Sequence, residues 1–147
     1  MNYFNHCIHY IPEENSEFHN YTNGFVPHLT IHMNLEKLDA EKKLKELKNI
    51  EPIEVTLIGE PIINYVPEFS SLYYNVKTVN ETPSWFPERA HISFIYKDGA
   101  EITPEEIEAL KNKITNKKCL LNNLKIMKLE DDFFNKLFKK QQTIKNN

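Results

Sequence analysis

The same short pattern occurs twice in this sequence, and the two copies lie some sixty residues apart. The first copy is Pro27-His28-Leu29-Thr30-Ile31 and the second is Ala90-His91-Ile92-Ser93-Phe94. In each, a histidine stands two positions before a hydroxyl residue and has apolar neighbours. Residues i and i+2 of a β-strand point to the same face, about 6.6 Å apart. Each copy therefore predicts a strand that directs an imidazole and a hydroxyl group to one face.

The first copy lies in a segment that predicts a strand followed by a helix. Residues 25–33 are rich in β-forming side chains, and a set of apolar residues then recurs at helical spacing among lysines and glutamates. These apolar residues are Leu38, Leu44, Leu47 and Ile50. The pattern predicts a surface helix that packs one face against the core.

The second copy is followed by the same order of elements. Residues 89–96 predict a strand, Lys97-Asp98-Gly99 predicts a turn, and a helix is predicted to begin at Thr103. Thr103 and Glu106 have the spacing of a capping box, and proline is well suited to the first helical position between them. The predicted buried stripe of this helix is Ile107, Leu110 and Ile114.

The rest of the chain predicts further strands and a terminal helix. Strands are expected over residues 3–11, 55–58, 72–79 and 124–129, with a polar loop after the first that extends to Gly24. Pro61 and Pro67 are expected to confine the segment that contains them to edges and turns. From Asp131 onward, aromatic residues at helical spacing predict a short helix that packs on the core or on another subunit.

The two histidines and two hydroxyl residues supply each role that a phosphodiester displacement requires. One imidazole can take the proton of the attacking oxygen while the other protonates the leaving oxygen, because an imidazole has an ordinary pKa of about 6.5. The hydroxyls of Thr30 and Ser93 can donate hydrogen bonds to the non-bridging phosphate oxygens. We therefore predict His28, Thr30, His91 and Ser93 as catalytic residues. This chemistry requires no metal and no cofactor.

Two strands of this type, separated by some sixty residues, resemble the signature of the 2H phosphoesterase superfamily. The resemblance covers most of the chain and implies a single domain over residues 1–147. It implies an α+β, two-lobed fold in which antiparallel sheets line a central cleft, each lobe contributes one histidine motif, and the helices lie outside. It also implies metal-independent hydrolysis or cyclising cleavage of nucleotide phosphodiesters.

The resemblance leaves several substrates open. The superfamily acts on RNA ends with a 2′,3′-cyclic phosphate, on 2′-5′-linked oligoadenylates and on cyclic oligonucleotide immune messengers. The chain is compact and rich in Lys, Asn and Ile, a bias typical of AT-rich genomes such as those of many phages. In this it looks like the phage anti-CBASS nucleases of the superfamily. We expect a viral enzyme that degrades such a messenger. The alternatives are an RNA 2′,3′-cyclic-phosphate or 2′-5′ phosphodiesterase and a non-catalytic, nucleotide-binding sponge.

The charge of the chain favours a small nucleotide as the partner rather than a long nucleic acid. The formal net charge is −3 and the isoelectric point is about 6.1, which does not suit a protein that neutralises many phosphates. Because no apolar run is long enough to span a membrane and the first residues lack the pattern of a signal peptide, we expect no membrane partner and a cytoplasmic location, in the host cytoplasm if the protein is viral. The oligomeric state stays open, and a homo-oligomer is one alternative.

Four further residues are candidates for substrate binding. Trp85 lies in a proline-containing loop that leads to the second motif, and either stacks on a base or anchors the core. Tyr10 and Tyr96 are weaker stacking candidates, because the position along a strand does not decide which face each occupies. Arg89 either contacts a phosphate or pairs with a neighbouring glutamate.

The remaining histidines and the cysteines receive no catalytic role. Cys7 and Cys119 are too few for a disulfide framework, so we predict reduced, ordinary residues. His32 is four positions from His28, a spacing of about 13 Å in a strand that one metal ion cannot bridge. His32 is therefore expected to be a neighbour on the cleft face or a structural residue. The other three, expected at ordinary surface or loop positions, are His6, His9 and His19.

Overall fold

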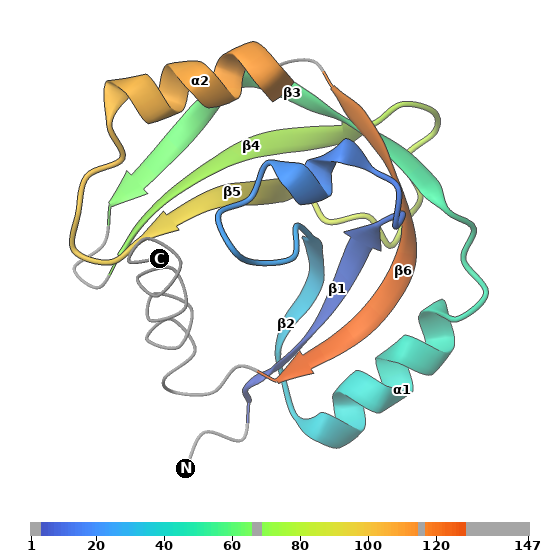
Figure 1. The fold of residues 1–147 in the computed structure, drawn as a ribbon. Helices are drawn as coiled ribbons and strands as arrows, with labels where there is room; N and C mark the ends of the chain where they lie inside the picture. Colours follow the sequence, from blue (N-terminus) through green and yellow to red (C-terminus); the bar gives the residue numbers. More distant parts are fainter. Residues whose placement is uncertain (1–3, 66–68, 115–116, 129–147) are drawn as a thin grey trace.

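A computed structural model describes residues 4–65, 69–114 and 117–128 (Figure 1). Six antiparallel strands form a closed barrel in the order β1-β2-β5-β4-β3-β6. In chain order, the elements are β1 (His6–Pro12), the 3₁₀ helix η1 (Glu17–Asn20), β2 (Leu29–Leu35), α1 (Lys37–Leu47), β3 (Ile53–Tyr65), β4 (Ser70–Thr78), β5 (His91–Lys97), α2 (Pro104–Ile114) and β6 (Lys118–Lys128).

The prediction of a two-lobed fold with a central cleft is wrong. Strand β6 pairs with β1 along one edge and with β3 along the other, so the sheet closes on itself. The two motif strands, β2 and β5, are direct neighbours in this barrel. Local alternation of side chains identifies a strand but does not say which distant strand it pairs with, because pairing depends on packing across strands. The mostly β architecture was therefore not accessible from the sequence pattern.

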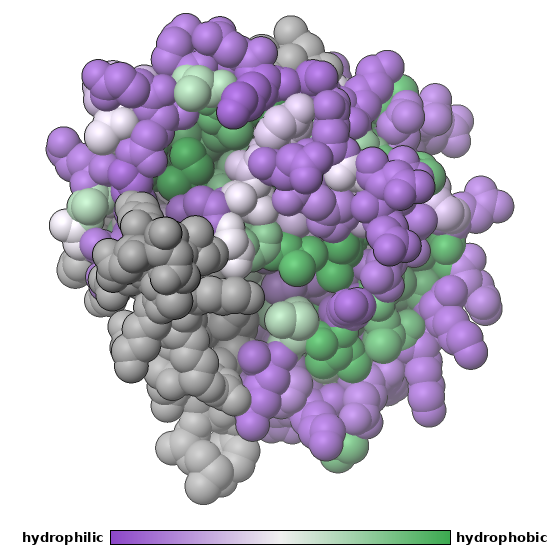
Figure 2. Space-filling view, viewed as in Figure 1, coloured by the Kyte–Doolittle hydropathy of each residue, from purple (hydrophilic) through white to green (hydrophobic). Residues whose placement is uncertain are grey.

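The hydrophobic core lies on one face of the barrel wall, which we call the core face. Every strand contributes to it, and both helices add buried residues, including Leu47 from α1 and Ile114 from α2. Phe94 is fully buried, with its ring edge-on to that of Phe18 in η1 and near that of Tyr74. The 3₁₀ helix therefore packs on the core through Phe18. The surface turned toward the viewer in Figure 2 is mainly hydrophilic, with smaller hydrophobic patches between the polar residues.

The two helices that were predicted to follow the motif strands both form, and they lie apart from each other. Helix α1 contacts β1 and β6, whereas α2 runs beside β3 (Figure 1). In α1, Leu47 is buried and Leu44 is partly buried, but Leu38 is 75 % exposed. Leu38, in the first turn of the helix, is therefore too exposed to belong to the buried stripe that we predicted.

Pro61 lies inside a continuous strand rather than in a turn between strands. The register between β3 and β4 shifts between Ile58 and Ile62, so a β-bulge surrounds the proline. Gly59, at the same bulge, has a φ of +70°. Strand β6 pairs with β3 only over residues 53–56, which leaves the proline on an unpaired edge. A bulge at an unpaired edge is where a strand tolerates proline, because no ladder hydrogen bond is lost.

The predicted capping box of α2 is confirmed. The Thr103 hydroxyl accepts a hydrogen bond from the Glu106 backbone N–H at 3.2 Å, and the Thr103 backbone N–H donates to the Glu106 carboxylate at 3.1 Å. The same carboxylate forms an ion pair with Lys97 at the end of β5. Glu106 therefore ties the start of α2 to the second motif strand.

Replacing Thr103 with alanine is expected to destabilise the protein by about 1 kcal/mol, because one helical N–H loses its acceptor. Urea unfolding followed by circular dichroism measures the difference. Thr103→Ser retains the hydroxyl and is the matched control, expected near wild-type stability. An alanine variant as stable as the serine variant would contradict the role of the cap.

The remaining sequence predictions have mixed outcomes. The last described strand, β6, begins at Lys118 rather than near residue 124. Both cysteines are free and buried, as predicted. The terminal helix predicted from Asp131 lies outside the described residues. Within the described ranges, no helix is long and apolar enough to cross a membrane.

Candidate active site

The two motifs meet at a single residue pair between adjacent strands. Leu29 of β2 faces Ile92 of β5, and both side chains are buried in the core. Because side chains alternate along a strand, the residues on either side of this pair point to the opposite face, which we call the polar face. Directly opposite and diagonal neighbours in an antiparallel pair lie within about 5–8 Å of each other at Cβ. The motif residues brought together in this way are His28, Thr30, His91 and Ser93.

The two catalytic candidates have the same backbone contact. Nδ1 of His28 lies 2.9 Å from the carbonyl oxygen of Val26, and Nδ1 of His91 lies 3.1 Å from the carbonyl oxygen of Arg89. A carbonyl oxygen only accepts hydrogen bonds, so Nδ1 must carry the proton in both rings. In its neutral form each ring then has its lone pair on Nε2, where it can accept a proton from a substrate.

His28 is half-buried, and its surroundings disfavour the charged form. Burial lowers the pKa of His28. The hydrogen bond to Val26 opposes this shift, while a positive charge on nearby His91 adds to it. His28 is therefore neutral at neutral pH and is able to act as a base.

A third histidine, His9 of β1, belongs to this site. It pairs with Thr30 across the strands, and its ring stacks on that of His28, with ring centroids 3.7 Å apart and planes 8° apart. His9 is only 7 % exposed, so our expectation of an ordinary surface or loop histidine is wrong. Apolar or aromatic residues flank it on both sides, a pattern typical of a strand buried on both faces, and this was the available signal.

Cys7, two residues before His9 in β1, contacts the His9 ring. Its Sγ lies 3.1 Å from His9 Nε2 and 3.6 Å from the Met127 carbonyl oxygen. Burial raises the pKa of Cys7 to about 11, so the thiol keeps its proton and donates to Met127, while the sulfur accepts from His9. Burial, together with charge on His28, lowers the pKa of His9 to about 3. His9 is therefore a neutral ring.

His91 has different surroundings from His28. It is exposed, and its ring lies against that of Tyr73 on β4 with centroids 4.9 Å apart. Asn75, also exposed, faces His91 across the same pair of strands. The His91 ring is therefore accessible to solvent, unlike the buried ring of His9.

Tyr96, one of the predicted binding residues, joins the site through a bulge. The register between β4 and β5 shifts at Phe94, which turns Tyr96 to the same face as Ser93. The Ser93 hydroxyl is within hydrogen-bonding reach of the Tyr96 phenol. Tyr96 also contacts Phe25 and Phe69, with ring centroids 4.9 and 5.7 Å apart respectively. Its half-buried phenol therefore lies beside the motif residues, where we predicted a contact with substrate.

Asn23 fixes this aromatic group to β5. Its side-chain amide donates to the Tyr96 carbonyl oxygen at 2.8 Å, and its amide oxygen accepts from the Tyr96 N–H at 3.1 Å. The backbone N–H of Asn23 also donates to Phe94. The predicted polar loop before β2 is thus hydrogen-bonded along the second motif strand.

Tyr10 and Trp85 lie apart from the motif residues. Tyr10 alternates with His9 and points to the core face, where it is 2 % exposed and donates to the Glu51 carbonyl oxygen at 3.2 Å. Trp85 is half-buried and packs against Tyr10, with centroids 5.8 Å apart. Tyr10 is thus a core residue, and the structure brings neither aromatic residue to the polar face.

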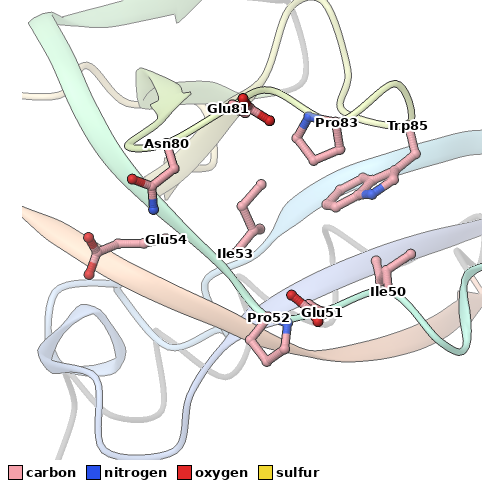
Figure 3. Close-up of a pocket in the computed structure, with 9 residues that line it drawn as sticks. All are labelled: Ile50, Glu51, Pro52, Ile53, Glu54, Asn80, Glu81, Pro83 and Trp85. Carbon is pink, nitrogen blue, oxygen red and sulfur yellow. The ribbon is translucent and has the colours of Figure 1, made fainter.

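Trp85 lines a separate open hollow of about 550 Å³, shown in Figure 3. Its other side chains come from the segment before β3, from the start of β3 and from the loop after β4. Three of them, Glu51, Glu54 and Glu81, are carboxylates. Negative charge in this position repels a phosphate, so the hollow does not complement the motif residues.

Two cations lie close to the motifs. Arg89 is exposed immediately before β5, and in the described part of the chain its side chain has no ion pair. Lys125 of β6 is exposed and faces His9 across the strands, on the polar face. His32 lies beyond a bulge in β2, where the charges that act on it are Lys43 and Glu46 of α1. His32 pairs with Ile8 and lies beside α1 rather than among the motif residues.

On the polar face, the two motif histidines offer their Nε2 atoms and Thr30 offers a half-buried hydroxyl. Ser93 is 8 % exposed, and its hydroxyl lies next to the Tyr96 phenol. No protein-family model matches the chain, and no curated protein matches it. Within the described residues, His, Cys, Asp and Glu form no group of three that could hold a metal ion. The two imidazoles and the Thr30 hydroxyl are groups that can exchange protons with a bound molecule and donate hydrogen bonds to it.

Proposed function

We propose that this protein is a metal-independent phosphodiesterase that uses His28 and His91 as its acid and base. One observation carries the proposal: both motifs present their histidine and hydroxyl on a single face around the Leu29–Ile92 pair. The matching Nδ1 contacts support it, because they direct both Nε2 atoms away from the backbone. A purely structural role would not require the same Nδ1 contact and the same neighbouring hydroxyl in both motifs.

In the proposed reaction, the ribose 2′-hydroxyl attacks the neighbouring 3′-5′ phosphodiester. One imidazole takes the proton from the 2′-hydroxyl, and the other gives a proton to the departing 5′ oxygen. Thr30 and Ser93 donate hydrogen bonds to the non-bridging oxygens, whose negative charge increases in the transition state. A second cycle with water then opens the 2′,3′-cyclic phosphate.

The substrate that we propose is a cyclic oligonucleotide of the immune-messenger type, which a viral enzyme degrades to antagonise host defence. The net charge of −3 favours a small substrate over a long nucleic acid. His91 is exposed and stands on the barrel wall, so an internal phosphodiester of a closed ring can reach it. The Tyr96 group beside Ser93 offers an aromatic surface for a base.

A substrate panel tests this proposal directly. Purified protein is incubated, with and without a chelator, with cyclic di- and trinucleotides, with an oligoribonucleotide that ends in a 2′,3′-cyclic phosphate, and with 2′-5′ oligoadenylate. We expect linear product from a cyclic nucleotide, at the same rate in the presence of chelator, when the mixture is separated by liquid chromatography.

Each other outcome contradicts a defined part of the proposal. Cleavage of only the open oligoribonucleotides would show that the substrate is an RNA end or a 2′-5′ linkage rather than a cyclic messenger. Recovery of intact cyclic nucleotide from a stable complex after denaturation would identify a binding sponge and exclude catalysis. Loss of cleavage on chelation would exclude the metal-independent mechanism.

A further inference from the structure

The rings next to the two catalytic candidates differ, although the backbone contacts of the candidates match. His28 stacks face to face on His9, an imidazole that is almost completely buried. His91 lies against the phenol ring of Tyr73 and is otherwise exposed. The two motifs are therefore not equivalent, because His9 of β1 lies beside one histidine and Tyr73 of β4 lies beside the other.

Two features disfavour a positive charge on His9. Its ring is removed from water, and a charge on the stacked His28 ring would repel it. Burying an uncompensated charge is costly, so the ring stays neutral. A neutral ring in contact with one whole face of His28 excludes water from that face, and the protonated form of His28 is destabilised as a result.

We propose that His9 is a positioning residue that keeps His28 neutral, so that His28 is the general base and His91 the general acid. This inference rests on the proposed phosphodiesterase function and adds the direction of proton transfer to it. His9 itself contacts neither the substrate nor the reacting atoms.

The proton balance follows from this assignment. His28 Nε2 takes the proton of the attacking 2′-hydroxyl, the bond from O2′ to phosphorus forms, and the bond from phosphorus to O5′ breaks. His91 Nε2 delivers its proton to O5′, so the products are a 2′,3′-cyclic phosphate and a free 5′-hydroxyl. His28 ends protonated and His91 neutral, and exchange with water restores both.

The titratable groups that act on His28 come from β1 and β5. On β1 this group is the stacked ring of His9, and on β5 it is His91, whose positive charge disfavours a second charge on His28. The next groups outward are Cys7 beside His9, Lys125 opposite His9, Tyr73 beside His91 and Tyr96 beside Ser93. The charge of His91 acts on His28 in the same direction as its burial.

The sign of the pH dependence follows. A base with a lowered pKa remains neutral at lower pH, so the acidic limb of kcat/KM lies below the ordinary range of histidine. If water replaces the His9 ring, the pKa of His28 moves up toward its ordinary value of about 6.5, and the acidic limb moves up with it. An apolar ring in the same place preserves the shift, because it also excludes water.

Two substitutions at His9 separate these effects. We expect His9→Ala to move the acidic limb of kcat/KM up by about one pH unit, which is about a tenfold loss of kcat/KM at the acidic end and a small change above pH 7.5. His9→Phe is expected to keep the wild-type profile. The control is His32→Ala, in β2 four residues after His28 but beside α1, which should also leave the profile unchanged. Equal profiles for the alanine variant and wild type would overturn the proposal.

Nitrogen NMR of the ¹⁵N-histidine-labelled full chain tests the same inference without any turnover. Wild-type protein is expected to protonate His28 only below the ordinary range of histidine, and His9→Ala to raise the protonation midpoint of His28. If His28 of the wild type titrates in the ordinary range, or if His9→Ala leaves its midpoint unchanged, the role given to His9 is wrong, whether or not the protein cleaves nucleotides. If both expectations hold but no panel substrate is cleaved, the proposed function fails while the electrostatic inference stands. The spectrum also reports whether each variant is folded.

Discussion

Alanine at His28 or at His91 is expected to lower the turnover of a cleaved nucleotide by about 10²–10⁴-fold, because each removes one of the two proton transfers. The double variant should be little worse than either single variant, since the two groups act in one step. Initial rates at saturating substrate measure the effect. His32→Ala serves as a matched histidine control and should retain wild-type turnover.

The stability of these variants is part of the test. His91 is exposed, so its replacement should leave the thermal midpoint almost unchanged. His28→Ala also removes the ring stacked on His9, and His28→Phe is the companion variant that restores a ring without a proton-accepting nitrogen. If either histidine can be replaced with turnover retained to within a few-fold, the two-histidine mechanism is wrong.

Phe94→Ala is expected to destabilise the barrel by about 3–5 kcal/mol, a loss that is large against the total stability of a typical domain. The side chain is fully buried and contacts the rings of Phe18 and Tyr74, so its removal leaves a cavity where η1 packs on the core. Chemical denaturation in urea, with the slope of the transition compared between variants, measures the change.

Phe4→Ala provides the comparison for this core substitution. Phe4 is 56 % exposed, and its replacement is expected to change the stability by less than about 0.5 kcal/mol. Similar losses for the two variants would contradict the assignment of Phe94 to the core. Because Phe94 also forms the bulge between Ser93 and Tyr96, its variant should show reduced activity at temperatures where it is still mostly folded.

The sequence was sufficient for features that depend on neighbouring residues. Alternation around Leu29 and Ile92 correctly indicated which side chains share a face, and the Thr103 capping box appeared where the spacing placed it. The order of strand and helix in both halves also formed. These features follow from side-chain direction and from hydrogen bonds within a few residues, both of which a local pattern encodes.

Features that depend on distant pairing were not predictable. The joining of β6 to both β1 and β3 closes the barrel, and no local pattern distinguishes such a strand from one at a free edge. The position of His9 beside His28 depends on the pairing of β1 with β2, and so does the burial of Tyr10 on the opposite face. A single-residue change of register exchanges these two faces, which is why Tyr10 was a candidate and His9 was not.

Closure of the barrel by β6 also bears on how firmly His9 is held. The β1–β6 ladder joins residues as far apart as His6 and Lys128, and closing so long a loop costs more entropy than closing a short one. Strand β1 reaches His28 through its other edge, where His9 pairs with Thr30 close by in the sequence. Because β1 is hydrogen-bonded on both edges, a substitution that weakens the distant β6 seam can change the position of His9 without touching any residue near it.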